Sequence, residues 1–220
     1  TAAKTMTTGV EATSVTVAST LNTGGNNLTV SAALDVTGTL DVGGAGTVAV
    51  GGDLTFGTLN NAVGSTFDLN GGGTQTVAPG GQTFGAVTVS NTSVVEWTGT
   101  STVGDVTVNP GSTVRLDANA TGPIVGDVTV NVTSGSTVTN NGTFSLDDNG
   151  GGNTLTLQGT AASATFSGTD ISWGGNSLTA GHLLYGPATG LANGTTVTLN
   201  NNVTFTGGVA LVGGSALDVG

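Results

Sequence analysis

Residues 33–56 read ALDVTGTLDVGGAGTVAVGGDLTF, and this stretch contains four copies of one short unit. Each unit is an apolar residue, a small residue and a second apolar residue, and Gly usually follows soon after. Because residues i and i+2 of a strand lie on the same face, each unit predicts a very short strand with two side chains in the core. The unit returns about every six residues, and further copies begin at Leu28, Phe67, Val87, Val106, Val114, Val128, Phe144, Leu155, Val197, Val203, Val209 and Leu217.

A longer period of about 19 to 22 residues is superimposed on this unit, and it separates Leu28, Val48, Phe67, Val87, Val106 and Val128. Periods of this length indicate stacked repeats. Three strands joined by Gly or Asn corners fill one period. The sequence therefore predicts a single all-β domain over 1–220, a three-sided right-handed parallel β-solenoid with about 20 residues per coil. An antiparallel β-sandwich with donor-strand exchange is the alternative, because the same strands could build it.

The register of the units is not equally clear everywhere. The best internal match aligns residues 104–108 (GDVTV) with residues 126–130, which have the same five letters. The pattern is least regular between Gly71 and Gly85, where Pro79 also marks a break. We expect a second irregular region, a loop or lateral insertion at about 180–194.

The chain has few charged residues, and almost all of them are acidic. Charged residues make up 7% of the sequence, against about 25% in ordinary domains, and Lys4 and Arg115 are the only Lys and Arg residues in a chain of net charge −11. Without a basic surface, nucleic acid is not an expected partner. No run of 18 apolar residues predicts membrane insertion. Together with the absence of Cys, this composition favours an extracellular or cell-surface location in a bacterium or archaeon.

The residues that could carry catalysis are too few and too scattered to predict an enzyme. One acidic pair (Asp147 and Asp148), the single His182 and the single Arg115 lie far apart in sequence, and no Gly-Xaa-Ser-Xaa-Gly motif is present. We therefore predict no catalytic residues and no cofactor-binding residues.

Calcium is the one cofactor that the acidic residues suggest. Asp residues stand at the centre of strand units or at the corner before them, and stacked carboxylates would repel one another unless a cation lay between them. The candidate Ca²⁺ ligands are Asp35, Asp41, Asp53, Asp105 and Asp127.

Thr-Xaa-Thr pairs suggest a different role for the outward faces. They occur at 37/39, 74/76, 100/102, 137/139, 154/156, 196/198 and 204/206, and regular Thr arrays resemble the ice-binding faces of some insect and bacterial antifreeze proteins. The pairs do not recur at one place in each coil, which counts against this reading.

The two ends of the chain suggest how copies could associate. No helical pattern predicts a cap, and uncapped solenoid ends are exposed edge strands that invite pairing with another chain. We expect the chain to associate with itself through residues 1–20 and 203–220. The predicted contact residues are Val15, Val17, Val203, Phe205, Val209, Leu211, Leu217 and Val219.

The run from Ala33 to Phe56 resembles the low-complexity β-solenoid repeats of bacterial surface proteins, namely autotransporter passengers and filamentous-haemagglutinin-like adhesins. The resemblance is one of repeat style, so it implies no functional residues. It implies an exported, non-enzymatic role. We expect a structural subunit of an extracellular filament or surface layer, with two alternatives: an adhesin passenger that binds glycans or a surface, and an ice-binding solenoid.

Overall fold

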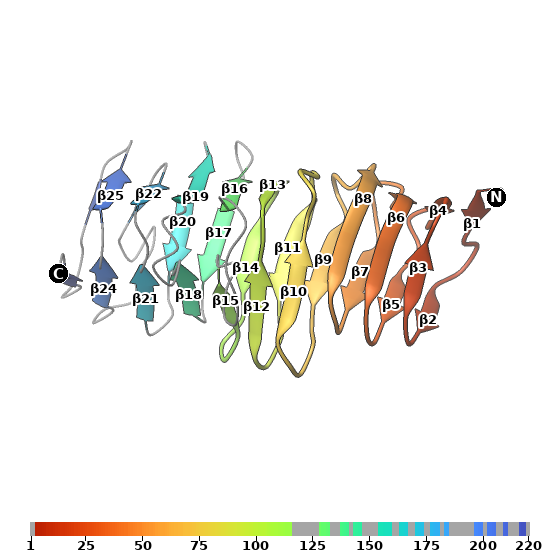
Figure 1. Ribbon diagram of the computed structural model, residues 1–220, viewed down its shortest axis with the longest axis horizontal. Coiled ribbons are helices and arrows are strands. Elements are labelled where there is room, and N and C mark those ends of the chain that lie inside the picture. Colours follow the sequence, from red (N-terminus) through yellow and green to blue (C-terminus); the bar gives the residue numbers. More distant parts are fainter. Residues whose placement is uncertain are drawn as a thin grey trace.

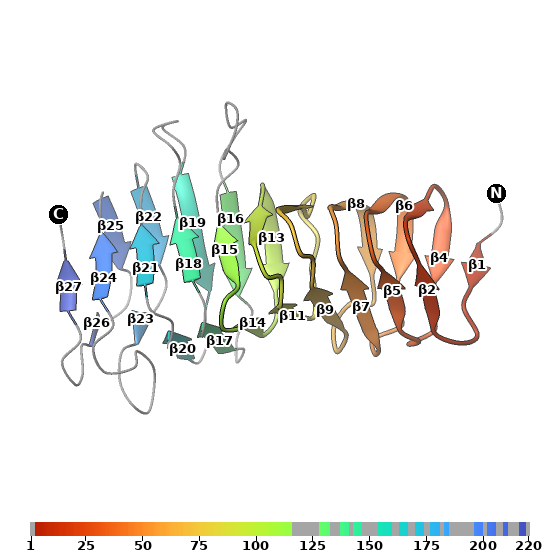
Figure 2. The same ribbon diagram turned by 90° about the horizontal axis from the view of Figure 1, so that it is seen from below.

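The computed structural model describes residues 3–115 without a break. After Arg115 it describes the backbone of strands β16 to β27, and Val130 is the one side chain described there. The strands wind along one axis, with β1 and β27 at opposite ends (Figures 1 and 2). Each coil visits three faces of the solenoid in turn.

The first face is an eight-stranded sheet, followed by the two-stranded sheet of β23 (Leu183–Leu184) and β26 (Val209–Ala210). The eight strands are β2 (Val10–Ala12), β5 (Leu28–Val30), β7 (Thr47–Val50), β9 (Thr66–Leu69), β11 (Ala86–Val89), β14 (Val106–Val108), β17 (Thr137–Asn140) and β20 (Ser163–Phe166).

The second face belongs to a twelve-stranded sheet. Its strands are β3 (Val15–Val17), the first halves of β6 (Leu34–Asp41) and β8 (Leu54–Asn60), β10 (Gln75–Ala78), β12 (Val94–Trp97), β15 (Thr113–Arg115), β18 (Thr143–Leu146), β21 (Asp170–Trp173), β24 (Thr196–Leu199) and β27 (Ala216–Asp218).

The third face consists of two separate strips. The first strip holds β1 (Lys4–Thr5), β4 (Thr20–Asn22) and the second halves of β6 and β8. The second strip is a five-stranded sheet of β13 (Thr100–Val103), β16 (Val128–Val132), β19 (Thr154–Gly159), β22 (Ser177–Ala180) and β25 (Asn202–Phe205). Between the two strips, the intervening coil forms no strand on this face and contributes only an isolated β-bridge between Thr83 and Thr102.

Every described pair of strands is parallel. Stacked strands lie about 19 residues apart in sequence within residues 3–115, as Val87 and Val106 do, but later coils are longer, and Val106 and Val138 lie 32 residues apart. The fold is therefore an all-β solenoid of about six turns, with no helix among the described residues. This confirms the predicted parallel solenoid, and the antiparallel sandwich is wrong. The long strands β6 and β8 each turn a corner, so one strand serves two faces.

The core is built from columns of apolar side chains that stack coil upon coil. Leu28, Val48, Phe67, Val87 and Val106 pair successively in one column, and each is at least 92% buried. Within each of these strands, the residue between two inward-pointing side chains is exposed or half-buried, as in the buried–exposed–buried pattern of β5. Burying such side chains at about 25 cal/mol per Å² supplies the main stabilising free energy.

Four aromatic rings fill the middle of the core. Phe56, Phe67, Phe84 and Trp97 meet edge to face, with ring centroids 5.0 to 6.0 Å apart. The Trp97 indole Nε1–H donates to Ser101 Oγ at 3.0 Å, so its buried polar atom is satisfied.

Buried amide side chains serve the backbone where the coil after β9 leaves the regular register. Gln75 Nε2 donates to the Val50 carbonyl at 2.9 Å. Asn91 Nδ2 donates to the Gly73 carbonyl at 3.0 Å, and Asn91 Oδ1 accepts from Ser93 N–H at 2.6 Å. Gln75 and Asn91 are completely buried, and their hydrogen bonds offset the cost of burying them.

One predicted alignment is wrong. Val106 pairs with Val138 on the first face, and not with Val128. Val128 pairs with Leu155 on the third face, where the neighbouring Thr129 pairs with Thr100. An apolar–Thr–apolar triplet places two side chains inward on any face, so the identical stretches 104–108 and 126–130 carry no information about which face each occupies. The predicted loop at about 180–194 falls outside the described residues, except for Ala180 and β23.

Corner glycines let successive coils approach closely. Gly38 lies where β6 turns from the second face to the third, and a Cβ there would overlap the backbone of Ser19 in the preceding coil. At Gly73, in contrast, an added Cβ would meet no atom within 4 Å.

We expect Gly38→Ala to lower the free energy of unfolding by about 2 kcal/mol, because the Cβ must push two stacked coils apart. The matched control Gly73→Ala should change it by less than about 0.5 kcal/mol. Equilibrium unfolding in urea measures both values. Equal effects of the two substitutions would contradict the role given to close coil stacking.

Candidate functional site

The interruption of the third face is the most unusual local feature of the described chain. The second half of β8 pairs with β6 on one side, while on the other side β8 pairs with β10 only at Leu54 and Thr55. The edge of residues 58–60 therefore has no strand beside it. A side chain partly replaces this strand: Gln82 Oε1 accepts from Leu59 N–H at 2.9 Å, and Gln82 Nε2 donates to the Gly57 carbonyl at 3.0 Å.

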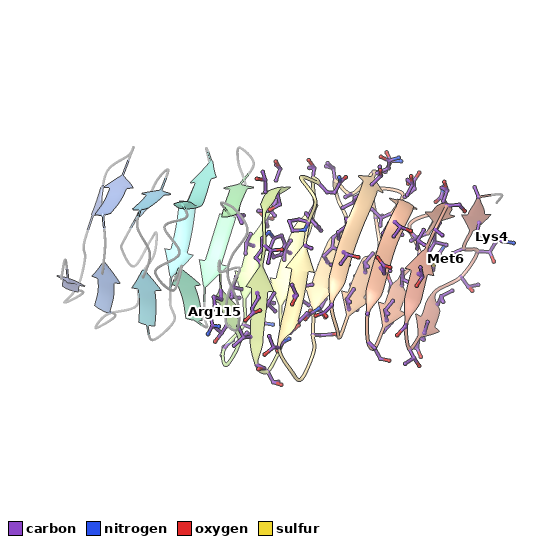
Figure 3. All side chains as sticks on the ribbon, in the orientation of Figure 1. Lys4, Met6 and Arg115 are labelled. Atoms are coloured by element: carbon purple, nitrogen blue, oxygen red, sulfur yellow. The ribbon has the colours of Figure 1, made fainter. Side chains whose placement is uncertain are left out.

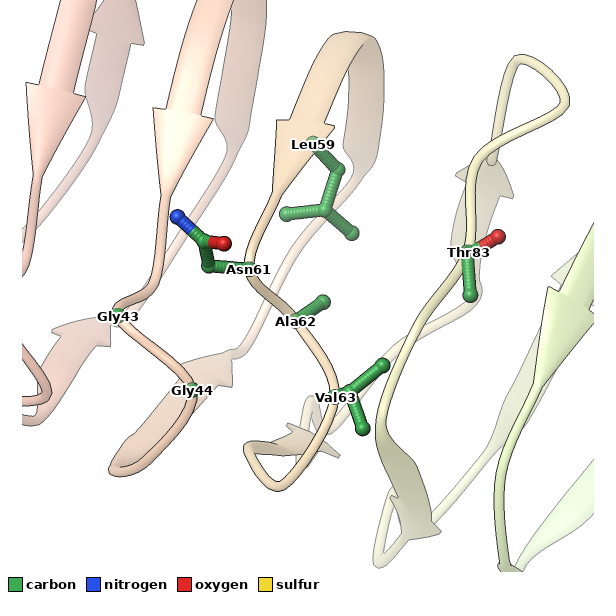
Figure 4. Close-up of a pocket in the computed structure, with 7 residues that line it drawn as sticks. All are labelled: Gly43, Gly44, Leu59, Asn61, Ala62, Val63 and Thr83. Atoms are coloured by element: carbon green, nitrogen blue, oxygen red, sulfur yellow. The ribbon is translucent and has the colours of Figure 1, made fainter.

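A groove of about 440 Å³ lies at this interruption (Figure 4). It is lined by residues of three successive coils: Gly43 and Gly44 from the first, Leu59, Asn61, Ala62 and Val63 from the second, and Thr83 from the third. The wall from the second coil is mainly apolar. We call this feature the third-face groove.

Two residues of the second coil make the rim of the groove unusual. The Val63 side chain is 76% exposed, far more than the next exposed large apolar residue, Val10 at 39%. Asn61 has φ +52°, and it is the only described non-glycine residue with positive φ. Asn tolerates this conformation better than most residues, and Asn61 Nδ2 also donates to Asp41 Oδ1 at 2.9 Å.

No motif in the sequence marks Gln82, Asn61 or Val63 as part of a site. The signal available was the loss of triplet register between Gly71 and Gly85, which includes Gln82 and Thr83. Nothing in the sequence marks Val63 as exposed, since Val is the commonest core residue of the other coils.

The calcium candidates do not come together. The part of the chain with described side chains has no group of three or more His, Cys, Asp or Glu residues that could hold a metal ion. In the strand registers Asp35 lies between Thr16 and Thr55, and Asp41 lies between Asn22 and Asn60, so neither carboxylate stacks on another. The repulsion that suggested a cation is therefore absent at these two positions.

Hydrogen bonds occupy three of these carboxylates instead. Asp35 Oδ1 accepts from Thr55 Oγ1 at 2.6 Å, and Asp53 Oδ1 accepts from Thr76 N–H at 2.8 Å. Asp41 Oδ1 accepts from Gly43 N–H at 3.1 Å. For Asp105, the backbone carbonyl accepts from Val87 N–H at 2.7 Å. Asp127 lies outside the described residues.

The turn at Asp41 repeats in the preceding coil with a neutral side chain. Asn22, which pairs with Asp41 in the strand register, accepts from Gly24 N–H at 2.7 Å in the same way. The hydrogen bond to the turn glycine thus needs a side-chain oxygen and no negative charge.

We expect Asp41→Asn to leave the free energy of unfolding within about 0.5 kcal/mol of its original value, and Asp41→Ala to lower it by about 1 kcal/mol. Millimolar Ca²⁺ or a chelator should leave the melting temperature unchanged. Scanning calorimetry measures these effects. A rise in melting temperature with Ca²⁺ that Asp41→Asn abolishes would contradict a purely structural role for Asp41 and would support a calcium site there.

The predicted self-association residues fall on the edge strands. Val15 and Val17 belong to β3, which pairs with β6 alone. Val203 and Phe205 lie in β25, Val209 in β26 and Leu217 in β27, and each of these strands pairs on one side only within the described chain. Leu211 and Val219 lie outside the described residues.

Threonine positions align more regularly than the sequence suggested. On the third face Thr100, Thr129, Thr156, Thr179 and Thr204 pair successively in one register column. Single Thr residues therefore recur at one place on this sheet, although the Thr-Xaa-Thr pairs do not. The Thr-Xaa-Thr pairs concealed the column, because Thr156 is the second member of its pair while Thr100 and Thr204 are first members.

The catalytic candidates are not assembled in the described part of the chain. Arg115 Nη1 lies 3.4 Å from Glu96 Oε1 across two strands of the second face, which is an ordinary cross-strand ion pair. Lys4 lies far from Arg115, near the N-terminal end (Figure 3). Asp147, Asp148 and His182 lie outside the described residues.

No family model, curated protein or solved structure matches this chain. The residues that the structure describes also include no helical segment with the length and hydropathy that a membrane crossing requires.

Proposed function

We propose that this chain is a structural subunit of an extracellular filament or surface layer, and that copies stack end to end through their edge strands. The observation that carries the proposal is the open parallel edge of the first coil. Among the described residues, strands β2 and β3 each pair with one strand only. Val10 of β2 is 39% exposed, whereas Leu28, its partner in β5, is 1% exposed. A further coil laid on this edge would bury the exposed side chain and pair the free backbone groups.

The order of the faces supports stacking in one orientation. At one end of the described solenoid, β25 lies on the third face, β26 follows the first-face sheet and β27 lies on the second face. At the other end, β1, β2 and β3 visit the faces in the same order. A second copy placed after β27 would continue all three sheets with parallel pairing. Such a heterologous contact does not close on itself, and it therefore builds a filament.

The small number of charged residues and the net negative charge also favour end-to-end stacking. Only 7% of residues are charged, so few ionic groups would have to lose water when coils meet at an end. The net charge of −11 is distributed along the chain, and repulsion between rods would disfavour side-by-side aggregation.

The backbone of Thr16 provides a direct test. Val15 N–H donates to the Ala33 carbonyl at 3.0 Å, so the next amide along β3, that of Thr16, points to the open edge. Thr16→Pro removes this donor at an edge position, where Pro is tolerated. We expect the unchanged chain to form regular filaments in which coils follow one another at about 4.8 Å, and Thr16→Pro to abolish them.

Electron microscopy across a range of protein concentrations makes this measurement, with circular dichroism to establish that both variants fold. The matched control Thr16→Val keeps the amide and should still form filaments. Monomeric rods at every concentration would refute the proposal, and rods that bind immobilised glycans would support the adhesin alternative.

A second candidate function is ice binding, and the threonine column of the third face favours it. Five Thr positions follow one another at the strand spacing of about 4.8 Å, and Thr100, the member with a described side chain, is exposed. A column of Thr positions at a constant spacing is an arrangement on which an ordered layer of water could form.

For this second candidate, we expect the chain to inhibit ice recrystallisation and the double substitution Thr156→Lys and Thr179→Lys to abolish the inhibition. The ammonium groups would disturb ordered water at the centre of the column. Thr29→Lys, on the first face, is the control and should keep full activity. A splat-cooling assay decides the question, and an inactive unchanged chain would exclude ice binding.

A further inference from the structure

We propose that the third-face groove binds one extended peptide segment that carries a Lys or Arg side chain, and that the segment completes the interrupted sheet. The proposal depends on backbone groups at both sides of the groove, on the apolar wall between them and on the charge at the rim. It does not depend on how copies of the chain associate.

The Gln82 side chain marks the place of a missing strand. In a parallel ladder, a residue that pairs with Thr58 accepts a hydrogen bond from Leu59 N–H and donates one to the Gly57 carbonyl. The amide of Gln82 makes these two bonds, at 2.9 and 3.0 Å. It therefore imitates one peptide unit of a strand beside β8, and a true strand would displace this side chain to take the same place.

The opposite side of the groove offers a second free edge. Thr102 N–H donates to the Gln82 carbonyl at 3.0 Å, and Phe84 N–H donates to the Thr102 carbonyl at 2.8 Å. Because successive peptide groups of a strand point in opposite directions, the N–H and C=O of Thr83 face the groove. Thr83 is exposed and lines the groove, so an inserted segment could pair with it.

The wall between the two edges suits an apolar side chain. Leu59 and Ala62 form its buried part, and Val63 is its exposed rim. An extended segment over this wall would remove most of the exposed surface of Val63 from water. Peptides that add a strand commonly gain affinity from backbone pairing and specificity from such side-chain contacts.

The negative charge at the rim of the groove favours a peptide with a basic side chain. The residues that line the groove include no charged side chain, and the Asp41 carboxylate lies at the rim, where it accepts hydrogen bonds from the lining residues Gly43 and Asn61. The two described cations, Lys4 and Arg115, belong to β1 and β15 and do not line the groove. Asp41 lies one strand beyond β8, about 10 Å from an added strand, within reach of a long basic side chain. The overall charge of −11 favours the same partner.

The probe is an acetylated, amidated and fluorescein-labelled hexapeptide of sequence TVTVKT, with TVTVET as the charge control. Fluorescence anisotropy with the full 220-residue chain should show binding of the Lys peptide about fivefold tighter than that of the Glu peptide, since one exposed ion pair contributes up to about 1 kcal/mol. Binding should also slow hydrogen exchange at the Thr83 amide.

Two pairs of variants separate the groove from the rest of the surface. Val63→Ser should weaken binding of the Lys peptide about tenfold, whereas the control Val10→Ser, at the other exposed valine, should not. Asp41→Asn keeps the turn and should remove the preference for Lys over Glu, whereas Asp35→Asn, on the second face, should preserve it.

A third variant tests the role of Gln82. Gln82→Ala frees Leu59 N–H and the Gly57 carbonyl, so the peptide should bind more tightly to this variant than to the unchanged chain. No binding of the Lys peptide at millimolar concentration would overturn the proposal. Equal weakening by Val63→Ser and Val10→Ser would overturn it as well, as would binding that leaves exchange at Thr83 unchanged.

Discussion

Parallel backbone pairing between successive coils is the constraint on which the rest of this structure depends. Each coil must present its peptide groups to the coils before and after it at a spacing of about 4.8 Å. This requirement explains the short triplets, whose inward side chains stack in columns such as Leu28, Val48 and Phe67. It also explains glycine at positions such as Gly38, where a Cβ would separate the coils.

Where the backbone of one coil cannot meet the next, polar side chains take over the hydrogen bonds. Asn27 Oδ1 accepts from Thr47 N–H, Asp53 Oδ1 accepts from Thr76 N–H, and Gln82 bonds to both Leu59 and Gly57. The Asp and Asn residues of the corners therefore have a structural explanation that requires no metal. At the third-face groove this replacement is partial, because Gln82 bonds to one peptide unit of β8 while the N–H and C=O of Thr83 face the groove.

The sequence predicts correctly which side chains enter the core, because this depends on neighbouring residues. It does not predict which residues stack on which, because this depends on the path of the chain. The alternation of Leu28, Thr29 and Val30 predicts which side chains enter the core, and the structure confirms it. The position of Val128 could not be found in this way, because its triplet fits every face equally well. Asp35 and Asp41 suggested stacked carboxylates, but their stacking partners are Thr and Asn, and partners follow from coil length and not from residue type.

The sequence by itself determined a parallel solenoid with an apolar interior, corners rich in Gly and Asn and a low charge, because alternation within a strand is a property of three adjacent residues. Only the tertiary structure decided which residues stack on which. It aligned Thr100 with Thr129 and Thr156, interrupted the third face beside Leu59 and left Val63 exposed. These outcomes depend on the length of each coil and on its fit against its neighbours, and a triplet carries neither quantity.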